Sequence, residues 1–507
     1  MKHTFSQAPT ADIPRSSFNR SHGLKTTFDA GKLVPIFLDE ALPGDTLTLN
    51  PTLFARINTP IYPIMDNLFL DVHFFAVPYR QIWDNFRRFC GEQTNPSATT
   101  DYVIPSMTSS SYGEETIFDY LGLPTKTPGY THSTLPLRAY NHIYNEWYRD
   151  QNLIDSLTVR TTDSGDLASD FTVQKRGKRH DYFTSCLPWL QKGESTPLPL
   201  GDSAPIATGG TGGDKLSVYA DPYSAQRALV PNVFTEISST NTGTVGAELY
   251  ADLSSATAST VNELRQAFQI QKLLERDARS GTRYSEIVKS HFGVNFLDVT
   301  YRPEFLGGTS SPVNFETHAS TNDGTRKMGD LAASGTIVCN GGGFTKSFTE
   351  HCVIMGIASV RADITYQQGL DRMWSRETRY DFFWPALAHL GEQAVLNKEI
   401  YTQGTAGGTD DNDVFGYQER WAEYRYKPSK ITGLMRSNAT APLDAWHLSQ
   451  EFGSLPALNQ TFIEENVPMD RVVAVTTEPD FHMDCYFNYQ CARPMPLYSV
   501  PGLIDHF

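Results

Sequence analysis

The feature that most limits how this chain can fold is a stretch of strict alternation near its end, Phe481–Cys491. Over eleven consecutive residues the odd positions are apolar and the even positions are polar or amphipathic. Successive side chains of a β-strand point to opposite faces, so a period of two predicts a long strand with one buried face. The predicted buried set is Phe481, Met483, Cys485, Phe487, Tyr489 and Cys491.

The same kind of pattern predicts further strands elsewhere in the chain. Leu68–Val77 alternates, and its second face is partly apolar, which indicates that this face is partly covered. Cys352–Val360 is apolar on both faces and is predicted to be a buried central strand. Shorter strands are predicted at Leu47–Leu49 and at Val472–Val475.

Helical periodicity appears in three places between these strands. Each place has an apolar stripe at helical spacing together with a recognisable start or stop signal. The predicted helices are Ile82–Cys90, which ends at Gly91, Leu137–Trp147, with Pro136 in its first turn, and Leu264–Leu274, which follows the capping box Thr260–Glu263.

The order of these elements decides the fold class. Strands and helices do not alternate regularly, which argues against a doubly wound parallel sheet. A mainly β fold fits better, a sandwich or jelly roll of antiparallel strands with helices in long connections. Residues 194–259 are rich in Gly, Ser, Thr and Ala with little apolar periodicity, and predict a surface insertion. A second, shorter insertion is predicted at Gln403–Asp413.

Composition excludes several classes of protein. With 39% hydrophobic and 20% charged residues, the chain is not disordered throughout. A net charge of −15 argues against a protein that neutralises nucleic acid with its whole surface. No apolar run is long enough to span a membrane, and the first residues do not resemble a secretory signal. Neither membrane insertion nor secretion is therefore expected.

The six cysteines carry little chemistry. None has C-x-x-C spacing, so zinc ribbons and thioredoxin-type motifs are excluded. Cys485 and Cys491 share one face of a single predicted strand, about 20 Å apart, which is too far for a disulfide. Buried thiols in a reducing compartment are the simpler expectation.

Catalytic and cofactor motifs are also missing. The stretch Gly209–Leu216 fails both the P-loop and the dinucleotide-binding pattern, and H-E-x-x-H and G-x-S-x-G do not occur. Isolated histidines such as His73 and His351 are expected to be structural. The acidic turn Asp410–Asp413 could in principle hold Ca²⁺, but it lacks the glycine and terminal glutamate of an EF-hand loop. No catalytic residue, cofactor or metal ligand is therefore assigned.

Two basic segments stand out against the acidic background, Lys175–His180 and Phe415–Arg436. The second has five cationic residues against Glu419 and Glu423, a net charge of +3, with aromatic residues between them. Such a mixture suits single-stranded nucleic acid, through phosphate neutralisation and base stacking, but it also suits packing between subunits. Both alternatives stay open. The candidate residues are Arg420, Arg425, Lys427, Lys430 and Arg436.

Longer segments carry a family resemblance. Arg15–Ile36, Asp39–Thr46, Leu264–Arg279 and Phe415–Arg436 resemble segments of the major capsid proteins of gokushoviruses, in the family Microviridae. The resemblance implies an eight-stranded antiparallel jelly roll, the viral capsid β-barrel, with long loop insertions carrying a few helices. It also implies a structural protein without enzyme activity, sixty copies of which close a T=1 icosahedral shell around circular single-stranded DNA.

The same resemblance implies partners and a division of the chain. It implies a virion protein that is assembled in the cytoplasm of a bacterial host together with a small basic DNA-binding viral protein. The cationic residues of Phe415–Arg436 would then face DNA or that basic partner. Residues 194–260 are the candidate for a protrusion at the threefold axes that contacts a host receptor. The arm and first jelly-roll part would occupy 1–193, and the remaining strands and C-terminal arm 261–507.

Two other functions remain as alternatives. One is a secreted carbohydrate-active β-sandwich enzyme, which would need a signal peptide and two carboxylates about 5–10 Å apart in a cleft. The other is a monomeric module that binds single-stranded DNA through residues 415–436, against which the net charge and the length of the chain both argue. The size of the assembled particle distinguishes the capsid protein from both.

Overall fold

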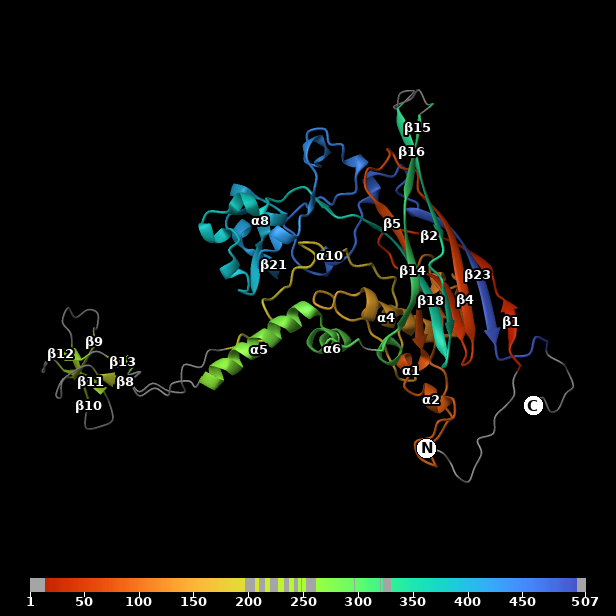
Figure 1. Cartoon of the computed structure of the whole chain (residues 1–507), viewed down its shortest axis with the longest axis horizontal. Coiled ribbons are helices and arrows are strands. Elements are labelled where there is room, and N and C mark those ends of the chain that lie inside the picture. The colour runs from red at the N-terminus through yellow and green to blue at the C-terminus, as the bar shows by residue number, and fades with distance from the viewer. Residues whose placement is uncertain are drawn as a thin grey trace. The chain divides into compact units, whose positions relative to one another are not determined.

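The structure is a computed structural model that describes residues 14–196, 261–295, 297–319, 321 and 330–498, together with the backbone of six short strands between 206 and 251. The chain divides into two compact units, Met1–Leu190 with Gly281–Phe507, and Gln191–Ser280. The first unit holds two antiparallel sheets with helices and short strand pairs around them (Figure 1).

The predicted alternating strand lies near the middle of the first sheet. It is β23 (Phe481–Arg493), and its residues are alternately buried and exposed from Phe481 to Cys491, as predicted. β23 pairs along its length with β4 (Thr46–Ile57), and on its other side with β1 and β2. The remaining strands of this sheet are β1 (Ser16–Asn19), β2 (His22–Phe28), β15 (Asn314–Ala319), β16 (Leu331–Asn340) and β17 (Phe344–Ser347).

The second sheet has the order β14-β5-β18-β3, with antiparallel pairs throughout. Its strand β18 (Cys352–Ala362) lies between two neighbours and is buried along almost its whole length, which confirms the predicted central strand. The other strands are β3 (Val34–Ala41), β5 (Leu68–Pro78) and β14 (Glu304–Pro312).

The main hydrophobic core lies between the two sheets. Phe37 of β3 contacts Phe487 of β23 with 5.2 Å between ring centroids, and it meets Phe74 of β5 at 6.2 Å. All three side chains are almost completely buried. The chain is therefore a mainly β sandwich in which each sheet contributes one face to a shared core.

The outer face of the second sheet is covered as well. Phe75 of β5 and Met355 of β18 turn away from the main core and pack in a second cluster with Tyr140. Tyr140 belongs to α4 (Leu135–Ile143), which continues into a π-helical turn, η1 (Tyr144–Tyr148). This second layer explains why β18 is apolar on both faces.

The other helices of the first unit are short. The predicted helix Ile82–Cys90 is wrong as a single element, because the chain forms two separate turns interrupted at Trp83–Asn85. The turns and short helices are α1 (Tyr79–Ile82), α2 (Phe86–Phe89), α3 (Ile117–Tyr120), α6 (Tyr284–Phe292), α7 (Asp298–Tyr301), α8 (Asn397–Ile400), α9 (Ala422–Arg425) and α10 (Gln460–Ile463).

Small strand pairs complete the first unit, and one predicted strand is absent from its described residues. Val472 and Val473 are buried in the main core, but from an irregular segment that makes a single bridge, between Pro60 and Val473. The pairs are β6 (Ser106–Ser110) with β7 (Pro128–Ser133), β19 (Thr365–Tyr366) with β22 (Ser429–Lys430), and β20 (Glu392–Leu396) with β21 (Val414–Glu419).

The second unit contains the segment predicted as an insertion. Its long helix is α5 (Val261–Ser280), and on it Leu264, Phe268 and Leu273 are exposed. The preceding Thr260 lies outside the described residues. The short strands form a sheet of order β11-β10-β9-β12 and a pair β13-β8; they are β8 (Ile206–Thr208), β9 (Lys215–Val218), β10 (Arg227–Pro231), β11 (Ile237–Thr240), β12 (Val245–Ala247) and β13 (Leu249–Ala251).

All six cysteines are free thiols, and Cys485 and Cys491 are buried on one face of β23 as predicted. Cys90 differs from the expectation, because it is exposed at the end of α2. No helix within the described residues is both long and apolar enough to cross a membrane.

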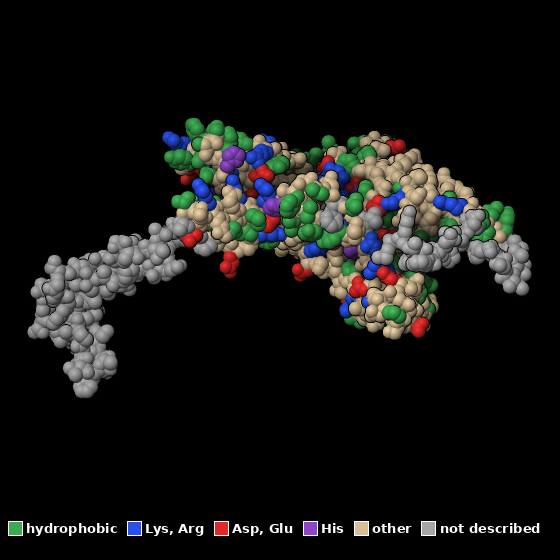
Figure 2. Space-filling model, turned by 60° about the horizontal axis from the view of Figure 1, so that its bottom comes forward, with side chains coloured by type: hydrophobic (Ala, Val, Ile, Leu, Met, Phe, Trp, Pro, Cys, Tyr) green, Lys and Arg blue, Asp and Glu red, His purple; other side chains and the backbone are tan. Residues whose placement is uncertain are grey.

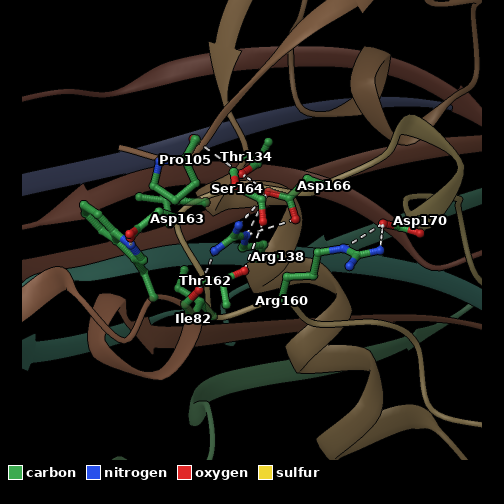
Figure 3. A network of polar contacts seen from close by, with 12 residues as sticks. Ile82, Pro105, Thr134, Arg138, Arg160, Thr162, Asp163, Ser164, Asp166 and Asp170 are labelled. Carbon is green, nitrogen blue, oxygen red and sulfur yellow. Dashed lines mark hydrogen bonds and ion pairs between the residues drawn. The ribbon is translucent and has the colours of Figure 1, made fainter. Parts of the chain in front are cut away.

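A buried ion pair fixes a long loop against α4. The guanidinium of Arg138 donates to Asp166 from Nε at 3.0 Å and from Nη2 at 2.7 Å, and both side chains are almost completely buried (Figure 3). Arg138 Nη1 also donates to the carbonyl of Ile82 at 3.2 Å, and the Thr134 hydroxyl donates to Asp166 at 2.5 Å. This network connects α4, α1 and the loop around Asp166.

Candidate functional site

The predicted basic and aromatic segment folds around one buried ring. β21 leads into Trp421, which is 4% exposed and adopts a left-handed backbone conformation with φ of 69°. Its backbone N–H donates to Gln393 Oε1 at 3.2 Å, and its indole Nε1 donates to the carbonyl of Leu387 at 3.2 Å. Trp421 therefore attaches this segment to residues 385–393, which the sequence pattern had not connected to it.

Three of the five candidate cations have partners in their own chain. Arg425 forms an ion pair with Glu419, and Lys430 Nζ lies 2.5 Å from Asp371 Oδ2. The guanidinium of Arg420 lies 4.8 Å from the ring centroid of Trp421. The two ion pairs reduce the charge that the segment offers to an external ligand, whereas the ring of Trp421 leaves the charge of Arg420 in place.

Lys427 and Arg436 differ from the other three candidates. Both are exposed, and within the described part of the chain neither has a carboxylate within ion-pair distance. The structure therefore leaves a smaller basic surface that is both exposed and without counter-ions than the sequence predicted, with these two residues as its members.

A second segment, 371–390, brings a group of aromatic side chains to the same place. It was missed because its 3₁₀ turns have neither a strand nor a helix period. Its only sequence signal is five aromatic residues among the thirteen of 372–384. We call the following side chains, from this segment together with Tyr424 of α9 and the adjacent Tyr426, the aromatic–arginine surface: Met373, Trp374, Arg376, Arg379, Tyr380, Phe382, Phe383, Trp384, Leu390, Tyr424 and Tyr426. All of them are exposed except Arg376, whose side chain is 13% exposed.

Arginines lie over several of these rings. The Arg376 guanidinium is 4.6 Å from the centroid of Tyr424 and 5.2 Å from that of Phe382. Arg379 lies 5.0 Å from the centroid of Tyr380. In Figure 2 hydrophobic side chains gather beside Lys and Arg at the upper left, the end at which Figure 1 places α8 and β21. Exposed aromatic residues and arginine are the residue types enriched at protein interfaces.

A buried polar cluster supports this surface from beneath. Arg372 Nη1 donates to Glu399 Oε1 at 3.1 Å and to the carbonyl of Ala394 at 2.7 Å. Tyr182 donates its hydroxyl to Glu399 Oε2 at 2.8 Å. Burial raises the pKa of Glu399 above its ordinary value, although the charge of Arg372 opposes that shift. Arg372 therefore connects the segment that carries this surface to a buried, hydrogen-bonded cluster.

His73 and the acidic turn Asp410–Asp413, to which the sequence assigned no site, have structural surroundings. His73 is largely buried and shares a 2.8 Å hydrogen bond with the Tyr148 hydroxyl, and burial lowers its pKa to about 4. The carboxylate of Asp411 accepts backbone N–H groups from Gln403 at 2.9 Å and Gly404 at 2.8 Å. Among the described residues, no three His, Cys, Asp or Glu side chains come together as metal ligands.

The first basic segment lies on the outer face of the second sheet. Arg176 Nη1 donates to Asp71 Oδ2 of β5 at 2.5 Å. Lys178 donates to Gln450 Oε1 at 2.8 Å, and burial lowers the pKa of this lysine to about 8. Glu465 is buried close by, and burial raises its pKa to about 7 against the opposing charge of Lys178.

This carboxyl predicts a pH-dependent stability. Because the pKa of Glu465 is higher in the folded than in the unfolded chain, the folded state loses stability as pH rises from about 4.5 through 7. Between pH 5 and pH 7.5 this effect should lower the free energy of unfolding of the unmodified chain by about 2–3 kcal/mol. Glu465→Gln has no titrating group at this position and should not show that loss. The free energy of unfolding of the variant minus that of the unmodified chain should therefore rise by the same amount over this pH range. Urea unfolding at both pH values measures this difference. The same difference at both values would contradict it.

Comparison with known proteins gives a consistent result over the whole chain. Residues 6–503 match the family described as "Capsid protein (F protein)". The chain is 47% identical to the capsid protein VP1 of Bdellovibrio phage phiMH2K, over all of this chain and 98% of that one. It is 44% identical to capsid protein VP1 of Chlamydia phage 1, over 99% of this chain and 98% of the relative. Identity to capsid protein VP1 of Spiroplasma virus 4 is 36%, over 99% and 97%.

Proposed function

The chain belongs to the capsid protein (F protein) family, and from this premise we propose how its parts build a phage shell around DNA. It is a structural protein of a bacteriophage capsid that assembles in many copies, not an enzyme. The carbohydrate-active enzyme and the monomeric DNA-binding module are thereby set aside.

We propose that eight strands of the sandwich form a jelly roll. Counted along the chain, these are β2, β3, β4, β5, β14, β16, β18 and β23. The strand order of one sheet is β2-β23-β4-β16, which are the first, eighth, third and sixth of these strands. The order of the other is β3-β18-β5-β14, which are the second, seventh, fourth and fifth. A jelly roll consists of two interlocked Greek keys, in which strands adjacent in one sheet are distant in the chain. This order is what supports the proposal.

Copies of the chain are proposed to meet through the aromatic–arginine surface and to close a T=1 shell of sixty. The single observation that carries this is the exposure of its large rings, with Trp374 70% exposed. Monomeric proteins rarely leave so many large apolar side chains together in water. The test is the particle size of the expressed chain, by light scattering and negative-stain electron microscopy. Closed shells or pentamer-sized precursors support the proposal, and a monomer under all conditions contradicts it.

The cargo is proposed to be circular single-stranded DNA, with most phosphate charge neutralised by a small basic viral protein. Among the five candidates Arg420, Arg425, Lys427, Lys430 and Arg436, we assign contact with DNA or that partner chiefly to the two unpaired cations. Replacing Lys427 and Arg436 with glutamate is expected to lower the DNA content of purified particles at unchanged particle size. The control is Arg425→Gln, which removes a charge that Glu419 already neutralises. Equal DNA content in both variants would contradict the assignment.

Residues 194–260 are proposed as the protrusion that contacts the host receptor. Their composition and their place in a separate compact unit, Gln191–Ser280, support this. We also propose assembly in the cytoplasm of the bacterial host. Shells whose 194–259 segment is replaced by a short linker should form and yet fail to adsorb to host cells; undiminished adsorption would argue against the proposed role.

A further inference from the structure

A pocket on the outer face of the second sheet collects cationic side chains. It encloses about 1250 Å³, part of which is open to solvent. Its floor is formed by β5 and β18, and its rim by η1, the segment 176–180 and residues near α6. One acidic residue lines it, Asp150, against six basic ones: Arg149, Arg176, Lys178, Arg179, Arg283 and Arg361. Arg179 is paired with Asp363, a carboxylate outside the lining. Arg283 is paired with Glu146 and Glu286, which also lie outside it. We call this the basic pocket.

One wall of the basic pocket is aromatic. Phe305 of β14 is 43% exposed, and its ring centroid lies 5.7 Å from that of Phe75, 5.8 Å from His73 and 5.9 Å from Trp147. The Trp147 indole is itself fixed by a 2.8 Å hydrogen bond to the carbonyl of Pro303. Phe305 is therefore an exposed ring packed against the buried Phe75 and two partly buried rings, an arrangement that can stack a base at low entropic cost.

The floor of the pocket carries more positive than negative charge. Arg176 Nη1 and Arg361 Nε each lie 2.5 Å from the same carboxylate oxygen of Asp71, which is 2% exposed. One buried carboxylate thus faces two guanidinium groups, and the trio has a net charge of +1. Such an excess at the base of a partly buried hollow favours an anion.

Arg149 is a cationic residue at the rim of the pocket. Its Nη1 donates to the carbonyl of Ile154 at 2.8 Å, but its Nε is buried without a hydrogen bond, and among the described residues it has no ion pair. Arg283 lies beside it and donates to its carbonyl at 3.2 Å. Burial and the charge of Arg283 both lower the pKa of Arg149, while Glu146 and Asp150 nearby oppose that shift. A ligand phosphate would relieve this repulsion.

We propose that the basic pocket binds one nucleotide of single-stranded DNA, with its phosphate at Arg149 and its base on Phe305. Phosphate alone would not need the aromatic wall, and an acidic peptide without aromatic residues, such as polyglutamate, has no ring to place on it. The proposal rests on the proposed function in one respect, that single-stranded DNA is the cargo. It adds a site whose lining includes neither Lys427 nor Arg436.

The test is binding of a fluorescent single-stranded oligothymidylate to the full-length chain, by anisotropy over a range of salt concentrations. Phe305→Ala is expected to weaken binding ~10-fold, the effect of losing one stacked base. Arg149→Gln is expected to weaken binding and to reduce the slope of log affinity against log salt by about 0.7, the value for one phosphate contact. The matched controls are Tyr486→Ala and Arg87→Gln, exposed residues outside the pocket, which should bind like the unmodified chain.

The outcomes separate this proposal from the proposed function. Thermal unfolding of each variant shows whether it is folded, and electron microscopy of the same samples shows whether shells form. Affinity that falls only in the two pocket variants supports the pocket. Equal affinity of pocket and control variants overturns it, as does binding of a polyglutamate peptide in place of the oligonucleotide. If shells form but no variant or parent chain binds DNA, the pocket assignment fails while the capsid function stands.

Discussion

Asp166→Asn is expected to lower the free energy of unfolding by about 3–5 kcal/mol, the usual cost of removing one partner of a buried ion pair. Asparagine has the size of aspartate but no charge, so the guanidinium of Arg138 would stay buried, with 0% side-chain exposure, and without a counter-ion. Asparagine also has an NH2 group in place of one carboxylate oxygen. That group cannot accept a hydrogen bond from Nε or Nη2 of Arg138, so at least one of these hydrogen bonds would be lost. Since the pair connects α4 to the loop around Asp166, that loop should detach first.

Chemical unfolding followed by tryptophan fluorescence and circular dichroism measures this loss. The matched control is Arg160→Gln, in the neighbouring pair with Asp170 (3.3 Å), which is partly exposed and should cost only about 0–1 kcal/mol. The double variant Arg138→Met with Asp166→Leu should recover much of the stability, because an apolar pair leaves no buried charge. A change below about 1 kcal/mol for Asp166→Asn would show that the loop tolerates an unpaired Arg138.

The strands could be predicted where one local rule agreed with the tertiary environment. Alternation in β23 matches a strand with the core on one side, and continuous apolarity in β18 matches a strand covered on both. Val472 and Val473 show where the rule fails, since both are buried in the core from an irregular segment. Burial in the hydrophobic core favours an apolar side chain, but it does not require that the residue belong to a β-strand. The predicted helix at Ile82–Cys90 failed for a similar reason, because its apolar residues anchor two separate turns.

The candidate site was only partly predictable, because it depends on contacts between distant segments. Sequence identified the cations of Phe415–Arg436 but not that Asp371 neutralises Lys430, nor that Trp421 is buried beneath residues 385–393. Charge patterning counts residues, whereas a binding surface depends on which charges remain unpaired after folding. The basic pocket shows the converse, since Lys175–His180 gains its aromatic wall from β5, η1 and β14.

Trp374→Ser is expected to abolish shell formation at concentrations where the unmodified chain assembles. The ring is 70% exposed, so its loss should change the stability of the single subunit by less than about 0.5 kcal/mol. At an interface between copies, however, a buried tryptophan contributes about 2 kcal/mol or more. In a closed symmetric shell every copy uses the contact, and a loss of 2 kcal/mol for each copy raises the concentration needed for assembly by about 30-fold.

Phe382→Ser should act in the same direction, since Phe382 belongs to the same surface and is 50% exposed. Tyr486→Ser is the matched control, because Tyr486 is 54% exposed on β23, outside the aromatic–arginine surface. Light scattering against protein concentration gives the assembly threshold, and thermal unfolding verifies that each subunit is folded. If Trp374→Ser and Phe382→Ser assemble at the threshold of the unmodified chain, this surface does not join copies, and its rings must serve another ligand. A raised assembly threshold with unchanged DNA content per shell would show that the rings join subunits. A ring that stacks on DNA bases would instead change the DNA content and leave the threshold unchanged.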